Sequence, residues 1–225
     1  MRKNERQTGQ NPNRGFVKRI DSEELFADYL SEHLLPYDRN YAVTSGDVDF
    51  RIERASSIVL CDVKEVRDSK KNPCGKLDAG GHIRSDLKKL REKFKKGRPD
   101  QPVVLVTMNC STNFFTGLTV ATALLGDIGI DFDKNTLPFT SPVHHLPHGN
   151  AVLTQTHNCS ISGVFVFDIE SRKHYLFRSP FTDHPVPSEC FPQVRVVDLS
   201  RKTQGQELAE LSNIMFWNTK WTDEP

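Results

Sequence analysis

Residues 47–66 read DVDFRIERASSIVLCDVKEV, and this stretch decides which fold the sequence predicts. Polar and apolar residues alternate over residues 47–53, which is typical of a half-buried strand. The apolar residues expected on one face of that strand are Val48, Phe50 and Ile52. Residues 57–66 are apolar on both faces until Asp62, as expected of a central strand. Because the link between the two runs is short, the sequence predicts an antiparallel hairpin.

The register of this hairpin places acidic residues opposite each other. We expect Glu53 to pair with Ile58 across the turn. In that register Asp49 lies directly opposite Asp62, and the Cβ atoms of directly opposed residues are about 5 Å apart. Asp62 and Lys64 are two residues apart on one strand, so their side chains leave the same face. The hairpin therefore gathers two carboxylates and one ammonium group.

These three side chains suit chemistry on a phosphate ester. Two adjacent carboxylates repel each other unless they share a cation, and their hard oxygen atoms suit Mg²⁺ or Mn²⁺. The ammonium of Lys64 beside the metal can orient or help to deprotonate an attacking water, and it can offset charge on the phosphoryl oxygens. The alternative is that Asp49 is an ordinary exposed strand residue and that Asp62 and Lys64 form a surface ion pair.

Helices and a further strand flank the hairpin. A helix is predicted to begin at Asp21 or Ser22, either of which can serve as its N-cap, and to end at Pro36. Its apolar stripe consists of Phe26, Ala27, Leu30 and Leu34. A second helix, with a basic exterior, is predicted over residues 83–96, and a buried strand over residues 102–108. The stripe of the second helix consists of Ile83, Leu87, Leu90 and Phe94.

The chain divides into an arm and one predicted α/β domain. Residues 1–19 are polar and lack periodicity, which predicts a disordered basic arm. We expect a single domain over residues 20–225, with a core at 20–110 and a C-terminal elaboration at 111–225. The elements predicted in this elaboration are a helix at 113–126, a hairpin of 163–168 and 174–178, a loop over 180–192 and a terminal helix at 206–216.

The charges of the chain are segregated, although the formal net charge is only +1. Residues 1–20 carry a net +5 and residues 64–98 a net +8, so the remainder carries −12. Such segregation suits one surface for phosphate and another for a cation, and its alternative is a solvated lysine-rich helix with a floppy tail. The residues expected to hold a nucleic-acid backbone are Lys70, Lys71, Lys76, Arg84, Lys88 and Lys89.

Asp49, followed thirteen residues later by Asp62-Val63-Lys64 on a hairpin between helices, resembles the PD-(D/E)XK nuclease superfamily. The resemblance implies a restriction-endonuclease-like αβββαβ core, with a central mixed sheet flanked by helices. It implies hydrolysis of phosphodiesters with a divalent cation, Mg²⁺ or Mn²⁺. Asp49 and Asp62 would be metal ligands, Val63 a ligand through its backbone carbonyl, and Lys64 the catalytic lysine.

The resemblance covers residues 20–110, about half of the chain. Two residues depart from the motif that names the superfamily. Val48 stands where that motif has proline, and Asp62 stands where glutamate is commoner.

A glutamate on the first helix completes the metal site in many members of the superfamily. Glu23 and Glu24 are the two candidates. Glu23 lies at helical spacing from the apolar stripe and so shares its face, whereas Glu24 is offset by about 100°. We therefore prefer Glu23 and leave Glu24 as the alternative.

The hypothesis from sequence is an Mg²⁺-dependent endonuclease that acts on DNA more readily than on RNA. Its catalytic residues would be Glu23, Asp49, Asp62 and Lys64. One alternative is a non-catalytic nucleic-acid-binding module with the same fold, and another is a structural or interaction subunit. Enzymes that cut both strands often pair two active sites, so a homodimer is an arrangement that fits this hypothesis.

The sequence also predicts a soluble, cytoplasmic protein without membrane contact. No apolar run approaches the roughly 18 residues of a membrane span, and the N-terminal residues lack the apolar region of a signal peptide. The five cysteines are scattered and odd in number, which is typical of reduced thiols.

Overall fold

The computed structural model describes residues 21–54, 56–67, 79–110, 114–126, 128–130, 143–145, 160–169, 173–199 and 205–216. The predicted arm at residues 1–19 lies outside these ranges. So do three of the expected nucleic-acid contacts, Lys70, Lys71 and Lys76.

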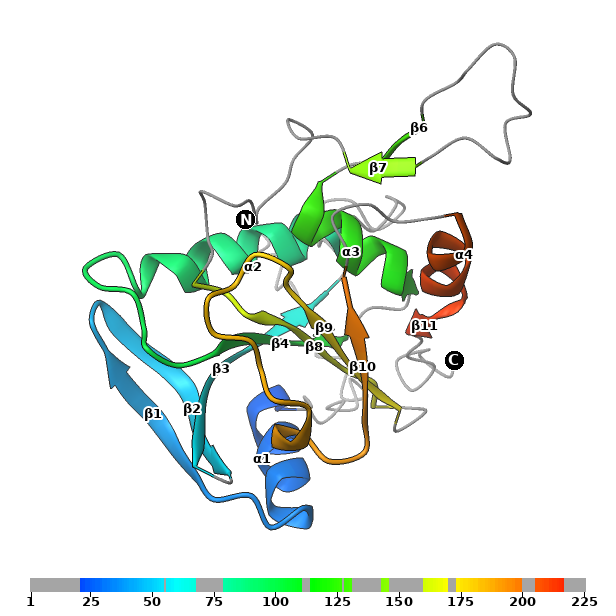
Figure 1. Cartoon of the computed structure of the whole chain (residues 1–225). Coiled ribbons are helices and arrows are strands. Elements are labelled where there is room, and N and C mark those ends of the chain that lie inside the picture. The colour runs from blue at the N-terminus through cyan, green and yellow to red at the C-terminus, as the bar shows by residue number, and fades with distance from the viewer. Residues whose placement is uncertain are drawn as a thin grey trace, which may run out of the picture.

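A seven-stranded mixed sheet forms the centre of the fold (Figure 1). Its strands in spatial order are β1 (Tyr37–Val43), β2 (Gly46–Arg54), β3 (Ser57–Val66), β4 (Val103–Asn109), β8 (Gly163–Phe167), β9 (His174–Arg178) and β10 (Val194–Asp198). Neighbours run antiparallel from β1 to β3 and between β8 and β9. They run parallel at β3–β4, β4–β8 and β9–β10. The prediction of an α/β protein with a central mixed sheet is confirmed.

Helices cover both faces of the sheet (Figure 1). The helices are α1 (Ser22–Glu32), α2 (Ala79–Glu92), α3 (Gly117–Leu125) and α4 (Gly205–Asn213). The remaining elements are β5 (Phe115–Thr116), β6 (Ile128–Ile130), β7 (Val143–His145), β11 (Met215–Phe216) and the 3₁₀ helix η1 (Ser188–Cys190). Side chains of α1 join the core cluster on one face, and those of the other three α-helices join the cluster on the opposite face. Within the described ranges, no helix is long and apolar enough to cross a membrane.

The β2–β3 hairpin has the predicted register. Glu53 pairs with Ile58, and the ladder continues to Phe50, which lies opposite Cys61. The ladder ends there, so the expected pair of Asp49 with Asp62 is not part of it, and Asp49 instead accepts the backbone N–H of Val63 with its side chain at 2.6 Å. The short link and the two apolar runs were nevertheless sufficient to predict the register of the ladder.

The expected common face of Val48, Phe50 and Ile52 is wrong. Phe50 and Ile52 pack in the cluster that contains α1, whereas Val48 packs in the cluster that contains α2. The β1–β2 ladder skips the pair of Asn40 with Asp49, and Asn40 has a positive φ of 51°. Because the ladder is interrupted there, β2 turns at Asp49, and residues two apart no longer share a face.

Helix α1 begins as predicted but ends one turn earlier. The Asp21 carboxylate caps it by accepting the backbone N–H of Glu23 at 3.0 Å. Leu34, expected in the apolar stripe, is 89% exposed, and this part of the prediction is wrong. Leu34 has a left-handed φ of 54° beyond the end of the helix, and Leu35 turns into the core in its place.

Helix α2 begins and ends four residues earlier than the predicted range of 83–96. The turn between β1 and β2 contacts its C-terminal end. The backbone N–H of Ser45 and the hydroxyl of Thr44 donate to the Lys93 carbonyl at 3.0 and 3.3 Å. The chain therefore leaves helical geometry at Lys93, and this side chain turns inward although it was expected on the basic exterior.

The C-terminal half agrees with the predicted order in part. The helix expected at 113–126 is α3, and the β8–β9 hairpin is confirmed. The terminal helix is α4, but its expected last residues form β11, which pairs with β5. The expected loop at 180–192 contains η1. Residue patterns did not predict the edge strands β1 and β10, and all of their side chains are exposed or half-buried.

Gly163 begins β8 where the β9 backbone comes very close. A Cβ at this position would lie 2.5 Å from the carbonyl oxygen of Phe177. Gly163→Ala must displace the ladder, and we expect it to lower the free energy of unfolding by about 1–3 kcal/mol, measured by chemical denaturation. Gly97→Ala is the matched control, because its Cβ would make an ordinary 3.5 Å contact with Thr44. Equal losses in both variants would contradict the close approach.

His174 lies in an aromatic cluster between α1 and the sheet. Its ring stacks on Phe167 at 4.3 Å between centroids and meets the Tyr29 ring edge-on at 5.1 Å. Burial lowers the pKa of His174 to about 4, with the Asp168 charge opposing this shift and the His33 charge adding to it. Below pH 6.5 the unfolded chain therefore binds a proton at this residue that the folded chain does not bind until about pH 4.

Folding stability should consequently fall as the pH drops from 6.5 to 4. The contribution of His174 to this loss is up to about 3 kcal/mol. Denaturant unfolding of the wild type and of His174→Phe across this pH range measures it. The variant keeps an aromatic ring and should lose less stability on acidification, and parallel curves for the two proteins would refute the assignment.

Candidate active site

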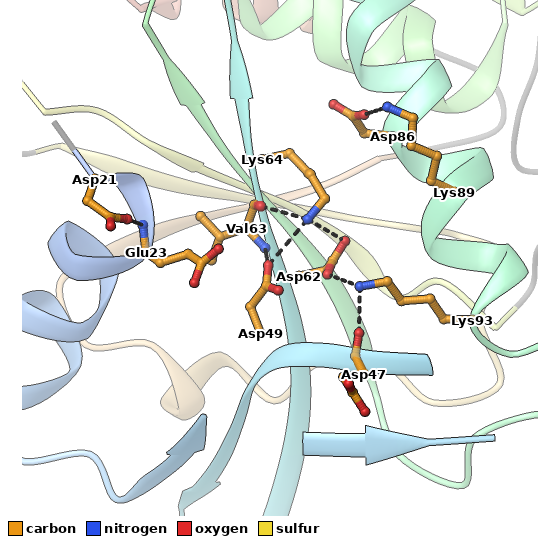
Figure 2. Close-up of polar contacts among 10 residues, drawn as sticks. All are labelled: Asp21, Glu23, Asp47, Asp49, Asp62, Val63, Lys64, Asp86, Lys89 and Lys93. Atoms are coloured by element: carbon orange, nitrogen blue, oxygen red, sulfur yellow. Dashed lines mark hydrogen bonds and ion pairs between the residues drawn. The ribbon is translucent and has the colours of Figure 1, made fainter. Parts of the chain in front are cut away.

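The predicted catalytic side chains meet beside the hairpin, between α1 and α2 (Figure 2). Strand β2 contributes Asp49, and β3 contributes Asp62 and Lys64. Glu23 points toward Asp49 from the first turn of α1 (Figure 2). Lys93 enters from the opposite side, directly after α2 (Figure 2).

Three oxygen atoms converge on the ammonium nitrogen of Lys64. Lys64 Nζ lies 2.9 Å from the Val63 carbonyl oxygen, 3.0 Å from Asp62 Oδ2 and 3.3 Å from Asp49 Oδ2. These oxygens belong to three of the four residues expected as metal ligands, and the fourth, Glu23, is not among the partners of Lys64. The structure therefore brings Asp49, Asp62 and Val63 together around one positively charged atom.

Asp49 is held in place by the neighbouring strand. Its Oδ2 accepts the backbone N–H of Val63 at 2.6 Å, although the regular ladder of the hairpin has ended one residue earlier. Burial raises the pKa of the Asp49 carboxyl, and the charge of Asp62 raises it further. The Val63 N–H and the charges of Lys64 and Lys93 act in the opposite direction but do not cancel the rise.

Asp62 is fully buried and contacts two lysines. Its Oδ1 accepts a hydrogen bond from Lys93 Nζ at 2.6 Å. Its Oδ2 forms an ion pair with Lys64 Nζ at 3.0 Å and has no hydrogen-bond partner among the described residues. Burying a carboxylate is costly unless charges and donors compensate, so the two lysines are what makes this position tolerable.

Lys64 is the most connected group of the site. Burial alone lowers its pKa, but the charges of Asp62 and Asp49 outweigh burial and hold the pKa above its ordinary value. The Lys64 side chain is 28% exposed, so it is only partly removed from solvent.

Sequence reasoning missed Lys93 as a member of the site. The residue was assigned to the basic exterior of the helix because it lies among other lysines. Lys93 follows Leu90 by three residues, as Asp86 follows Ile83, so both polar residues lie on the buried stripe. Charged residues at stripe positions were the signal that could have identified them.

The geometry distinguishes between the two glutamates of α1. Burial raises the pKa of Glu23 and the Asp49 charge raises it further, so Glu23 is close enough to interact with the site. Glu24 instead pairs with Arg39 at 2.7 Å. Glu23 is nevertheless exposed, and the expectation that it shares the buried face of α1 is wrong. It reaches the site from the solvent side of the helix terminus.

The site offers oxygen ligands that fit a hard divalent cation. Two carboxylates and a backbone carbonyl already surround one positive charge, and the Oδ2 of Asp62 is a buried oxygen without a hydrogen bond. Mg²⁺ and Mn²⁺ prefer such oxygen donors and complete their shell with water or substrate oxygen. In the part of the chain that the structure describes, no three or more Asp, Glu, His or Cys residues form a metal-binding group. The fit therefore depends on two carboxylates and the Val63 carbonyl.

Three of the basic residues that were expected to hold nucleic acid belong to α2. Lys88 is exposed, Arg84 is half-buried, and Lys89 pairs with the buried Asp86 at 2.8 Å. The Asp86–Lys89 pair lies on the side of α2 that faces Lys64 and Lys93 (Figure 2).

Comparison with protein-family models, with curated proteins and with solved structures found no match. The functional interpretation therefore depends on the geometry of the site and on the motif.

Removing both lysines should show how strongly the buried Asp62 carboxylate destabilises the fold when it has no counter-charge. We expect Lys64→Met/Lys93→Met to lower the free energy of unfolding by about 3–5 kcal/mol, because a buried carboxylate is left without a counter-charge. Adding Asp62→Asn to this double variant should restore most of the loss. Denaturant unfolding in EDTA measures all three proteins. Lys95→Met, at an ion pair with Glu92 in which both side chains are exposed, is the control and should change stability by less than about 1 kcal/mol.

Proposed function

We propose that the protein is an Mg²⁺- or Mn²⁺-dependent endodeoxyribonuclease that hydrolyses phosphodiester bonds. The observation that carries this proposal is the convergence of Asp49 Oδ2, Asp62 Oδ2 and the Val63 carbonyl on one cationic atom. A site for a hard cation, next to a lysine and a basic helix, is suited to a phosphate ester.

The order of elements supports the resemblance to the PD-(D/E)XK superfamily. Up to β4 the chain runs helix, three strands, helix and strand, with the motif on the second and third strands. This is the order of the restriction-endonuclease-like core that the resemblance implies. We propose that residues 20–110 form such a core and that the rest of the chain extends it.

Asp49, Asp62 and the Val63 carbonyl would hold the cation, with Glu23 adding negative charge beside Asp49. When bound, a divalent cation lowers the pKa of a coordinated water and offsets charge on the phosphate.

Lys64 would act on the phosphate directly. Its ammonium is surrounded by acceptor oxygens, and an ammonium group can donate hydrogen bonds but cannot accept a proton. The role that fits this environment is to orient the attacking water and to offset charge that develops on the phosphoryl oxygens, rather than to remove a proton. Its partial exposure leaves room for a substrate phosphate to approach.

We propose that α2 and the residues between β3 and α2 in the sequence hold the DNA backbone. The residues concerned are Arg84, Lys88 and Lys89 of α2, together with Lys70, Lys71 and Lys76. Contacts of this type neutralise phosphates, so binding should weaken steeply as salt increases. A homodimer would allow both strands of a duplex to be cut.

Plasmid and single-stranded DNA cleavage, with Mg²⁺, Mn²⁺ or EDTA, tests this proposal. We expect cleavage that EDTA abolishes and that Lys64→Ala lowers by at least about 100-fold, because a group that offsets charge in the transition state is removed. Asp62→Asn should be equally inactive. Asp183→Asn is the matched control, since Asp183 is exposed and pairs with Arg98 remote from the hairpin in sequence, and it should cleave within about twofold of the wild type.

Three results would contradict the proposal in different ways. Metal-dependent cleavage that survives Lys64→Ala would refute the role of Lys64. Salt-sensitive DNA binding without cleavage would favour a non-catalytic binding module. Negligible DNA affinity at low salt would favour a structural or interaction subunit.

A further inference from the structure

Lys93 is held at its backbone by the β1–β2 turn and at its ammonium group by the start of β2. Its backbone carbonyl accepts hydrogen bonds from the Ser45 N–H and the Thr44 hydroxyl. Its ammonium donates to the carbonyl oxygen of Asp47 at 2.6 Å and to Asp62 Oδ1 at 2.6 Å. The lysine therefore ties the turn before Asp49 to the carboxylate of Asp62.

Because of the contact with Lys93, the two carboxylate oxygens of Asp62 have different surroundings. Oδ1 is engaged by Lys93, and Oδ2 faces Lys64 and Asp49 without a hydrogen bond. A carboxylate that bridges two metal ions in a two-metal site uses one oxygen for each ion. Because Oδ1 is hydrogen-bonded to an ammonium group, Asp62 has only one oxygen left to coordinate a metal ion.

The net charge of the side chains in the site also favours a single divalent cation. Glu23, Asp49 and Asp62 are acidic, and Lys64 and Lys93 already offset two of these three charges. One divalent cation would bring this group of side chains close to neutrality. A second would leave a large excess of positive charge in a partly buried place, which is unfavourable.

We propose that Lys93 is a positioning residue that engages Oδ1 of Asp62 and thereby restricts the site to one divalent cation per chain. This inference rests on the proposed function. Lys93 acts through Asp62, because its ammonium donates to Asp62 Oδ1 and to the Asp47 carbonyl oxygen.

Calorimetric titration of the full chain with Mn²⁺ alone tests the inference without relying on cleavage. The wild type should bind one ion. Lys93→Met should bind Mn²⁺ at least about threefold more tightly, because a positive charge has left the neighbourhood of the ligand. In a cleavage assay the same variant should have a lower kcat, by about 10-fold or more, with KM for DNA within about twofold of the wild type.

Two further variants make the result specific. Lys93→Arg keeps a charged donor, so it should bind Mn²⁺ like the wild type and recover part of the lost kcat. Lys95→Met removes the same charge two residues later, where the lysine pairs with Glu92, and should leave Mn²⁺ affinity within about twofold of the wild type. Thermal unfolding shows at which temperature each variant is folded for these measurements.

The outcomes separate this inference from the proposed function. Two ions bound by the wild type, or unchanged Mn²⁺ affinity in Lys93→Met, would overturn the role of Lys93 while leaving a metal-dependent nuclease intact. A wild type that binds no Mn²⁺ and does not cleave would overturn both. A raised KM with unchanged kcat in Lys93→Met would show that Lys93 contacts DNA and would overturn the positioning role.

Discussion

The Asp62 carboxylate is removed from water, and two lysines from different parts of the chain offset the cost of its burial. Lys64 comes from the same strand, and Lys93 comes from the residue after α2. A carboxylate in this position is unfavourable without both partners, so the strand, the helix terminus and the turn that holds Lys93 depend on one another. This mutual dependence explains how the charged side chains of Asp62, Lys64 and Lys93 can lie within contact distance of one another at the end of the hairpin.

The hairpin and the helix terminus meet around this carboxylate. The β1–β2 turn donates hydrogen bonds to the Lys93 carbonyl, while β2 supplies Asp49, whose carboxylate accepts the N–H of Val63. The interruption of the ladder at Asn40 and Asp49 releases the Asp49 side chain from regular pairing. An irregularity next to a site commonly serves to direct a side chain toward it, and the turn of β2 at Asp49 fits that pattern.

Much of the hairpin and of the site could be predicted because local rules govern them. Strand periodicity and a short link determine the register, and two-residue spacing places Asp62 and Lys64 on one face. The same rules failed where a contact from elsewhere overrides them. Val48 changed face at an interrupted ladder, and Leu34 turned outward after its helix ended early. Strand β1 has seven residues that show almost no burial, so its existence depends on hydrogen bonds to β2 rather than on its own pattern.

By itself, the sequence determined the pairing of the hairpin and the gathering of Asp49, Asp62 and Lys64, because these residues lie within sixteen positions of one another and backbone geometry relates them. Only the tertiary structure decided that Lys93 joins Asp62 from 31 residues away, and that Glu23, rather than Glu24, interacts with Asp49. Those contacts arise from the packing of α1 and α2 on opposite faces of the sheet. Helical spacing from Leu90 marks Lys93 as a polar residue beside a buried stripe, but no periodicity within a short segment encodes which distant residue its ammonium meets or where the packing ends the helix.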